Sequence, residues 1–157
     1  MARKTPRADR TALICAVDLL ARQDQSEARL RQKLINREYP KKEIDEAIDR
    51  LKQLNYLNDQ RACSYQFDIM YQSNRYSFMQ ICNKLFQMGF AKELIDSFKP
   101  EDCEDHDKST AIHFLKSKFK TLPEDKKMWQ FLSTKGFSYS VISNAIDKYK
   151  IDMSQND

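Results

Sequence analysis

The stretch SEARLRQKLINREYPKKEIDEAIDRLKQL, residues 26–54, decides the fold of this chain. Its apolar residues recur at steps of three and four, which places them on one face of a helix; they are Leu30, Leu34, Ile44, Ile48 and Leu51. The stretch therefore predicts two amphipathic helices, each with one face toward a core.

The ends of both helices carry local signals. Ser26 is expected to cap the first helix, because its hydroxyl can accept a hydrogen bond from an unpaired backbone amide. Pro40 suits the opening turn of the second helix, where no amide proton is needed. Tyr39 is the predicted residue of the bend between them.

The composition around this stretch indicates an all-α protein. Among 157 residues, 41% are hydrophobic, which is enough for a folded chain. Two glycines, four prolines and no alternating β-branched run leave little material for hairpins. No apolar stretch approaches the roughly 20 residues of a membrane-spanning helix, and residues 2–10 lack the apolar core of a signal peptide. We expect no contact with a membrane and a cytoplasmic location.

The opening pattern recurs twice, at offsets of 51 and 47 residues. Three sets of anchors correspond: Leu30 and Leu34 with Ile81 and Leu85 and with Met128 and Leu132; Tyr39 with Phe90 and Phe137; Ile44 with Ile95 and Ile142. This spacing predicts three tandem three-helix repeats. Because a unit of this size buries little core alone, neighbouring units should pack into an elongated, curved array.

The pattern sets the expected boundaries. They are a basic arm at 1–10, repeats at 11–57, 58–104 and 105–151, and a tail at 152–157. The first repeat should open with a helix over 11–22 that places Leu13, Val17 and Leu20 on one face. The basic arm either contacts phosphates or is a solvated tail without a dedicated role.

The second repeat should contain a helix over residues 59–73, capped by Asn58 or Asp59. Its expected inward residues are Ala62, Tyr65 or Gln66, and Ile69. In the following helix, Ser77 and Gln80 have the spacing of a capping box. Gly89 and Gly136 are predicted to stop helices, and Ser138 to cap the last one.

No motif for catalysis, cofactor binding or metal binding is present. The sequence lacks a glycine-rich phosphate loop, an H-E-x-x-H helix and a nucleophile elbow. Acidic pairs such as Glu43 with Glu46 are expected to form solvated ion pairs on their helix. The cysteines at 15, 63, 82 and 103 predict free thiols, and the nearest approach to a ligand set, Cys103, His106 and His113, matches no zinc spacing.

Charge points to binding as the function. The net charge is +4, from 27 basic and 23 acidic residues, and both ends of the chain are positive while the middle is negative. Arg29, Lys33 and Arg37 recur every four residues beside the Leu30 stripe. The full set of candidate contacts for a protein partner or DNA is Arg22, Arg29, Lys33, Arg37, Arg75, Lys116, Lys120, Lys126 and Lys127. Each is either a binding residue or part of a solvated face; Arg75 stands between Tyr71 and Tyr76 and could also stack on them.

Three segments resemble the RecX family of regulators of the bacterial recombinase RecA. They are LLARQDQSEARLRQKL (19–34), EIDEAIDRLKQLNYLNDQRAC (43–63) and FLSTKGFSYSVISNAI (131–146). The resemblance covers residues 12–150 and implies three tandem three-helix repeats, in agreement with the spacing. It also implies a protein without enzymatic chemistry or cofactor that lies in the groove of the RecA filament on DNA. There it would limit filament growth, ATP hydrolysis, strand exchange and co-protease activity.

The middle repeat departs from the family pattern. Many relatives carry a basic loop of the form R-x-K-G-x-G, whereas this chain has YQSNRYSFMQ (71–80), in which Arg75 is the only charge. Two further functions stay open at this point, a direct nucleic-acid-binding helical module and a helical adaptor for another protein. For the RecA-binding function we expect a monomer whose partners are the RecA filament and single- or double-stranded DNA, contacted directly or through the filament.

Overall fold

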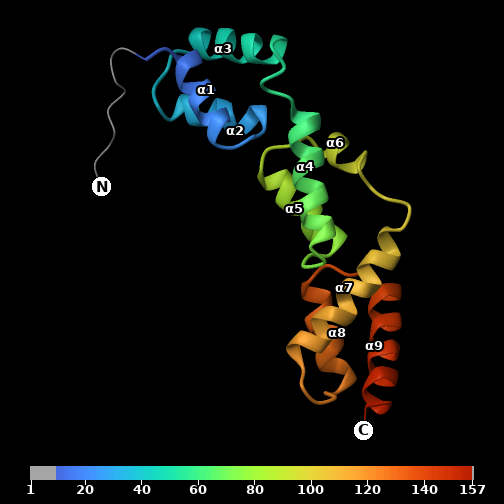
Figure 1. The fold of residues 1–157 in the computed structure, drawn as a ribbon. Helices are drawn as coiled ribbons and strands as arrows, with labels where there is room; N and C mark the ends of the chain where they lie inside the picture. Colours follow the sequence, from blue (N-terminus) through green and yellow to red (C-terminus); the bar gives the residue numbers. More distant parts are fainter. Residues whose placement is uncertain (1–9, 157) are drawn as a thin grey trace, which may run out of the picture. The chain divides into compact units, whose positions relative to one another are not determined.

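Every regular element is an α-helix in the computed structural model, which describes residues 10–156 (Figure 1). The helices are α1 (Ala12–Arg22), α2 (Glu27–Ile35), α3 (Lys41–Gln53), α4 (Asp59–Gln72), α5 (Phe78–Gln87), α6 (Lys92–Asp96), α7 (Cys103–Lys118), α8 (Asp125–Thr134) and α9 (Tyr139–Ser154). The predicted fold class is confirmed. All but one residue of the predicted basic arm, and the last residue of the predicted tail, lie outside the described residues.

The first three helices surround a small apolar core. Leu30 and Leu34 of α2 are fully buried against Ile48 and Leu51 of α3. As predicted, the Ser26 hydroxyl accepts a hydrogen bond from the Arg29 amide, 3.2 Å away, and so caps α2. Pro40 is the N-cap residue of α3, one residue before the turn expected for it.

The last three helices surround a second core. It contains Leu115 of α7, Met128 and Leu132 of α8, and Ile142 and Tyr149 of α9. The Tyr149 hydroxyl, although buried, donates to the Phe119 carbonyl at 3.2 Å. Ser138 caps α9 as predicted, because its hydroxyl accepts a hydrogen bond from the Val141 amide at 3.4 Å.

The repeat anchors are core residues. Leu30, Leu34, Ile81, Leu85, Met128 and Leu132 all have 0% of their surface exposed. Ile44, Ile95 and Ile142 are also buried, as are Phe90 and Phe137, while Tyr39 is half-buried. The spacing of large apolar residues therefore identified equivalent core positions in all three parts of the chain.

Packing divides the chain into two compact units. One unit holds the described residues up to 65 together with 85–95, and the other holds 66–84 and the described residues from 96 onward. Helices α4 and α5 each pass from one unit to the other. The boundaries of the three predicted repeats stay a prediction.

A hydrogen-bonded contact in the first unit, here called the first junction, joins the start of α2 to α4 and to the end of α5. The Ser26 hydroxyl donates to the Met88 carbonyl at 2.5 Å, directly before Gly89. The Glu27 amide donates to the Asp59 carboxylate at 2.8 Å. These bonds satisfy amide and carbonyl groups that the ends of helices leave unpaired.

The second unit repeats this arrangement at the second junction. The Ser77 hydroxyl donates to the Lys135 carbonyl at 2.6 Å, directly before Gly136. The Phe78 amide donates to the Asp107 carboxylate at 2.8 Å. Both glycines have the positive φ predicted for helix stops, 92° at Gly89 and 81° at Gly136.

Two helices bury faces other than the expected ones. In α1 the buried residues are the small Ala12, Cys15 and Ala16. Of the three residues predicted for the inner face, Leu20 is half-buried against the core, whereas Leu13 and Val17 are 36% and 43% exposed. Small side chains allow a neighbouring helix to approach closely. Close packing, and not the size of the side chains, therefore decides which face of α1 is buried. In α4 the prediction holds for Ala62 and is wrong for Ile69, which is exposed; of the two alternatives, Gln66 is half-buried and Tyr65 is exposed. The buried residues of α4 are Ala62, Cys63, Phe67 and Met70.

Candidate binding surface

Arg29 and Lys33 of α2, together with Arg37 in the turn directly after this helix, form a basic edge, here called the Arg29 edge. Because Leu30 and Leu34 hold the helix against the core, Arg29 and Arg37 are exposed and Lys33 is half-buried. Burial lowers the pKa of Lys33, and the positive charges of Arg29 and Arg37 lower it further. This mutual effect requires the three charges to lie near one another. Within residues 10–156, none of them forms an ion pair with an acidic side chain.

Arg31 lies on the same helix but has a structural role. Its guanidinium pairs with the Asp45 carboxylate of α3 and with Glu27, 3.4 Å away. The hydrogen bond to Asp45 is the main cause that raises the pKa of Arg31. Lys52 completes the group, 3.0 Å from the second Glu27 oxygen. Ion pairs thus join α2 to α3 on this side and leave the cations of the Arg29 edge available.

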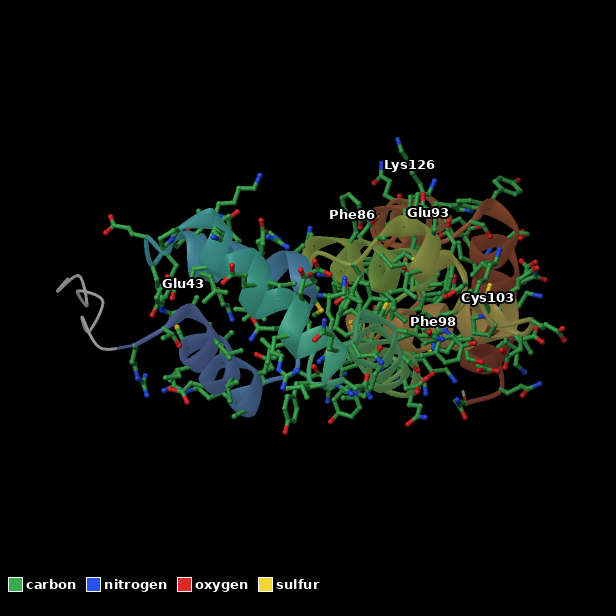
Figure 2. All side chains as sticks on the ribbon, turned by 90° about the horizontal axis from the view of Figure 1, so that it is seen from above. Glu43, Phe86, Glu93, Phe98, Cys103 and Lys126 are labelled. Carbon is green, nitrogen blue, oxygen red and sulfur yellow. The ribbon has the colours of Figure 1, made fainter. Side chains whose placement is uncertain are left out.

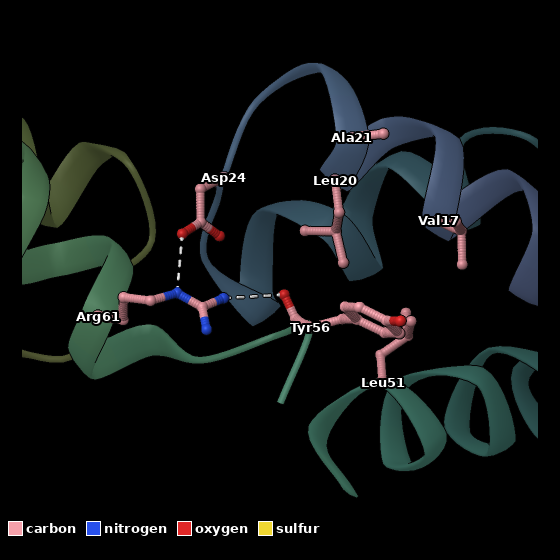
Figure 3. Close-up of a pocket in the computed structure, with 7 residues that line it drawn as sticks. All are labelled: Val17, Leu20, Ala21, Asp24, Leu51, Tyr56 and Arg61. Atoms are coloured by element: carbon pink, nitrogen blue, oxygen red, sulfur yellow. Dashed lines mark hydrogen bonds and ion pairs between the residues drawn. The ribbon is translucent and has the colours of Figure 1, made fainter. Parts of the chain in front are cut away.

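Arg22, another candidate, is the exposed last residue of α1. Nearby in the sequence, Val17, Leu20 and Ala21 of α1 line a pocket of about 490 Å³ (Figure 3). The opposite wall and one end are formed by Asp24, Leu51, Tyr56 and Arg61.

Arg61 lies at one end of this pocket, where three of its N–H groups are hydrogen-bonded. Its Nε lies 3.4 Å from the Asp24 carboxylate, and one Nη donates to the Tyr56 carbonyl at 3.1 Å (Figure 3). The other Nη donates to the Asn55 carbonyl at 2.8 Å. No spacing rule singles out Arg61, because its partners are two backbone carbonyls and the carboxylate of Asp24, 37 positions earlier in the chain. The pocket is lined mainly by apolar side chains, and its two charged residues, Asp24 and Arg61, pair with each other.

Arg75 is exposed in the turn after α4, and its amide donates to the Ser73 hydroxyl at 3.3 Å. Both flanking tyrosines contact other side chains. The ring of Tyr71 stacks on His106 at a centroid distance of 3.9 Å, and Lys84 Nζ lies 4.7 Å from the ring of Tyr76. Burial and a hydrogen bond to Asp102 raise the pKa of Tyr71.

The four predicted lysines of the last unit differ from one another. Lys116 pairs with Asp152 at 2.7 Å, and Asp152 also binds Lys148, so these hydrogen bonds lower the pKa of Asp152. Lys120, Lys126 and Lys127 are exposed and make no ion pair within the described part of the chain; Lys126 points away from α8 (Figure 2). Sequence reasoning missed Lys118 and Lys135, whose Nζ atoms lie 5.9 and 5.6 Å from the ring centroid of Phe131.

The acidic and sulfur-containing side chains have structural partners. Glu43 lies between α3 and the start of α1, where its carboxylate accepts from the Ala12 amide at 2.9 Å (Figure 2). It therefore supports a helix end instead of forming the expected solvated ion pair. The four cysteines are thiols and form no disulfide with one another, as predicted. Burial raises the pKa of Cys82 and of Cys103, which disfavours the reactive thiolate.

Over residues 10–156, no three His, Cys, Asp or Glu side chains come together as a metal site. His106 packs between Tyr71 and Asp107, whereas His113 is exposed, so the two histidines do not meet with Cys103. No helix in the same range has both the length and the apolar character needed to cross a bilayer.

Comparison with known proteins gives concordant matches. The family model for the first three-helix domain of RecX matches residues 12–51, which span α1, α2 and most of α3. The regulatory protein RecX of Haemophilus influenzae (strain PittEE) is 30% identical over 128 residues, covering 77% of this chain and 83% of the relative. That of Clostridioides difficile (strain 630) is 29% identical, and the match covers 85% of this chain but 65% of the relative's length.

Solved structures agree in fold. The crystal structure of RecX from Lactobacillus salivarius superposes with a TM-score of 0.76 at 19% identity, covering 89% of this chain and 95% of that one. A second crystal structure, of a regulatory protein RecX, gives 0.69 at 24% identity over 87% of this chain and 70% of that one. The sequence matches, more than the structural ones, decide the family. The chain belongs to the RecX family of regulatory proteins.

Proposed function

We propose that this protein binds the RecA filament on DNA through the Arg29 edge and restrains the filament. It acts in the cytoplasm as a monomer, by binding and not by catalysis. The expected consequences are slower filament extension, slower ATP hydrolysis, and weaker strand-exchange and co-protease activities. The observation that carries the proposal is the Arg29 edge, three cations that have no acidic partner among residues 10–156 and lie on the segment that the RecX family model matches.

The electrostatics of the edge support contact with an anionic surface. Lys33 is held between two like charges, and burial weakens its hydration, so an acidic partner would relieve both costs. Such a surface also steers a partner during encounter and affects the association rate more than the final affinity. The edge would therefore favour the first contact with a filament.

The test is the DNA-dependent ATPase of RecA with increasing amounts of this protein. We expect substoichiometric inhibition by the wild type and at least about tenfold weaker inhibition by Arg29→Glu, Lys33→Glu, Arg37→Glu, because each reversed charge in a complementary interface costs of the order of 1 kcal/mol. The matched control reverses three exposed, unpaired cations of α3, Lys41, Lys42 and Arg50, and should inhibit like the wild type.

Three outcomes would count against the proposal. No inhibition by the wild type at equimolar protein would reject RecA as the partner and favour the adaptor function. Equal loss in both triple variants would show that only net charge matters. Tight, steeply salt-dependent DNA binding by the Arg29 edge without RecA would favour a direct nucleic-acid-binding module. Circular dichroism melts of both variants confirm that the fold is retained.

A further inference from the structure

The nine lysines between residues 103 and 154, on α7, α8, α9 and the segments between them, fall into two sets that differ in their partners. On α7 and α9, Lys108, Lys116, Lys148 and Lys150 each have a carboxylate within 3.3 Å; their partners are Glu104, Asp152 and Asp125. Within residues 10–156, a second set forms no ion pair, and its members are Lys118, Lys120, Lys126, Lys127 and Lys135. The acidic side chains of this unit thus neutralise one set and leave the other positive.

Phe131 joins most of the unpaired set into one cluster. Lys118 Nζ and Lys135 Nζ lie 5.9 and 5.6 Å from the centroid of its ring, and Lys135 is also 6.0 Å from the ring of Phe114. Lys127 precedes Phe131 by four residues on α8, so both side chains share a helix face.

Lys120 is included by its place in the sequence, at an exposed position. It follows Phe119, whose ring meets Phe131 edge-on at 5.8 Å. We call Lys118, Lys120, Lys127 and Lys135 the Phe131 cluster. Lys126 occupies a neighbouring face of α8 and is left out.

The aromatic rings hold the ammonium groups of Lys118 and Lys135 in place. A cation over a ring face is attracted by about 0.5–1 kcal/mol at an exposed site, so less side-chain freedom is lost when a ligand binds. The ammonium protons stay available for an acceptor, because a ring face uses the charge and not a specific donor geometry. The cluster is therefore partly organised before any ligand arrives.

We infer that the Phe131 cluster binds the phosphate backbone of a nucleic acid directly. Its cations are all lysines, which suit phosphates as point charges and offer no bidentate geometry for carboxylates. A protein interface needs a buried apolar anchor, whereas Phe114, Phe119 and Phe131 are already partly buried beneath the lysines. Backbone binding requires only closely spaced positive charge.

This inference deepens the proposed function, because it assigns the nucleic acid of the filament to a surface separate from the Arg29 edge. It also alters the patch that the sequence suggested. Lys116 leaves it because Asp152 neutralises its charge, and Lys118 and Lys135 enter it through Phe131.

The test measures fluorescence anisotropy of a labelled single-stranded oligothymidylate with the full chain, in the absence of RecA. The triple variant Lys118→Gln, Lys127→Gln, Lys135→Gln should bind more weakly, with a salt slope lower by about 2, since each single-strand phosphate contact contributes about 0.7. Between about 50 and about 200 mM salt, the wild-type affinity should then fall roughly 20-fold more than that of the variant.

The matched control removes the same charge from the paired lysines of the same unit, in Lys108→Gln, Lys116→Gln, Lys148→Gln. It should keep the wild-type slope. If the cluster triple does not fold, Lys120→Gln, Lys127→Gln, at two exposed positions, should still lower the slope by about 1.4.

Equal slopes in the site and control variants would overturn the inference, as would the absence of wild-type binding at low salt. Binding of a polyglutamate peptide as tightly as the oligothymidylate would also overturn it and indicate an acidic protein surface. A wild-type chain that inhibits RecA ATPase but ignores free DNA would refute this site alone. A wild-type chain that binds DNA but does not inhibit the RecA ATPase would refute the proposed function alone.

Discussion

At the first junction the carboxylate that accepts from the start of α2 is half-buried, whereas its counterpart at the second junction is 9% exposed. Asp59 lies at the first position of α4, among the charges of Glu27, Lys52 and Asp24. Asp107 lies within α7, beside the His106 ring. The same hydrogen bonds are therefore made in a more solvated setting in the first unit and in a drier one in the second.

The residue three places after the capping serine shows what this difference allows. At the second junction, Gln80 accepts a hydrogen bond from the Ser77 amide at 3.1 Å and completes the predicted capping box. At the first junction the equivalent residue is Arg29, which has no acceptor atom for this bond. One side chain thus completes a helix start, and the other serves the exposed edge proposed to bind the partner.

The glycines give the largest expected difference between the junctions. A Cβ at Gly89 would lie 2.7 Å from Ser26 Oγ, which already holds two hydrogen bonds, whereas a Cβ at Gly136 would lie 2.9 Å from the flexible Met79 sulfur. Left-handed backbone costs any other residue about 1–2 kcal/mol, and loss of a serine cap costs about 1 more. We expect Gly89→Ala to destabilise by about 3 kcal/mol and Gly136→Ala by about 1.5, measured by urea unfolding.

A double variant separates backbone strain from the clash. Ser26→Gly added to Gly89→Ala removes the obstructing hydroxyl, so the two losses should be less than additive. Additive losses, or equal costs at the two glycines, would show that Ser26 moves aside as easily as Met79.

Removing each carboxylate should give the next largest effect. Asp107→Ala leaves the Phe78 amide without an acceptor in a buried setting, and we expect a loss of about 2 kcal/mol. Asp59→Ala should cost about 1 kcal/mol, because water can reach the Glu27 amide beside the half-exposed site. Thermal melts followed by circular dichroism compare them, with Asp→Asn at each position as the control that keeps an acceptor oxygen. Equal costs would mean that both sites exclude water alike.

Local signals in the sequence predicted the parts of these junctions but not their assembly. Ser26, the Ser77 and Gln80 pair, and both glycines follow from rules that act within one turn of helix. Asp107 bonds to an amide 29 positions away, and no spacing rule connects the two. Long-range polar contacts of this kind depend on packing, which a periodic pattern does not encode.

Side-chain size was a good guide to the core except where small residues pack. Leu34 and Leu85, which occupy matching positions in the repeated pattern, are both buried, as the pattern predicted. In α1 the larger side chains are the exposed ones, since Ala12 and Ala16 occupy the contact. For the candidate surfaces, sequence spacing identified the Arg29 edge. It could not separate Lys116 from Lys118, because the acidic partner of Lys116 is on another helix.

The smallest expected effect is a pH dependence that differs between the junctions. Burial raises the pKa of Asp107 above its ordinary 3.8, against opposing hydrogen bonds from the Phe78 amide and His106. A raised pKa means that folding favours the protonated carboxyl group of Asp107. The stability that this group contributes is therefore complete below pH 3.8 and is lost as the pH rises through the pKa of the folded state. Asparagine does not titrate, and the wild type should therefore lose stability relative to Asp107→Asn as the pH rises from about 3 to about 7.

Burial also raises the pKa of Asp59, where the Glu27 amide and the charge of Lys52 oppose the rise. The wild type should lose stability relative to Asp59→Asn in the same direction, but by less, because solvent screens a half-exposed carboxylate. Urea midpoints of the three proteins across this pH series measure both differences. If the stability of the wild type instead rose relative to that of Asp107→Asn with increasing pH, the carboxylate charge would stabilise the second junction, through His106, by more than its burial costs. The two junctions would then differ in the sign of their electrostatic contribution and not only in its size.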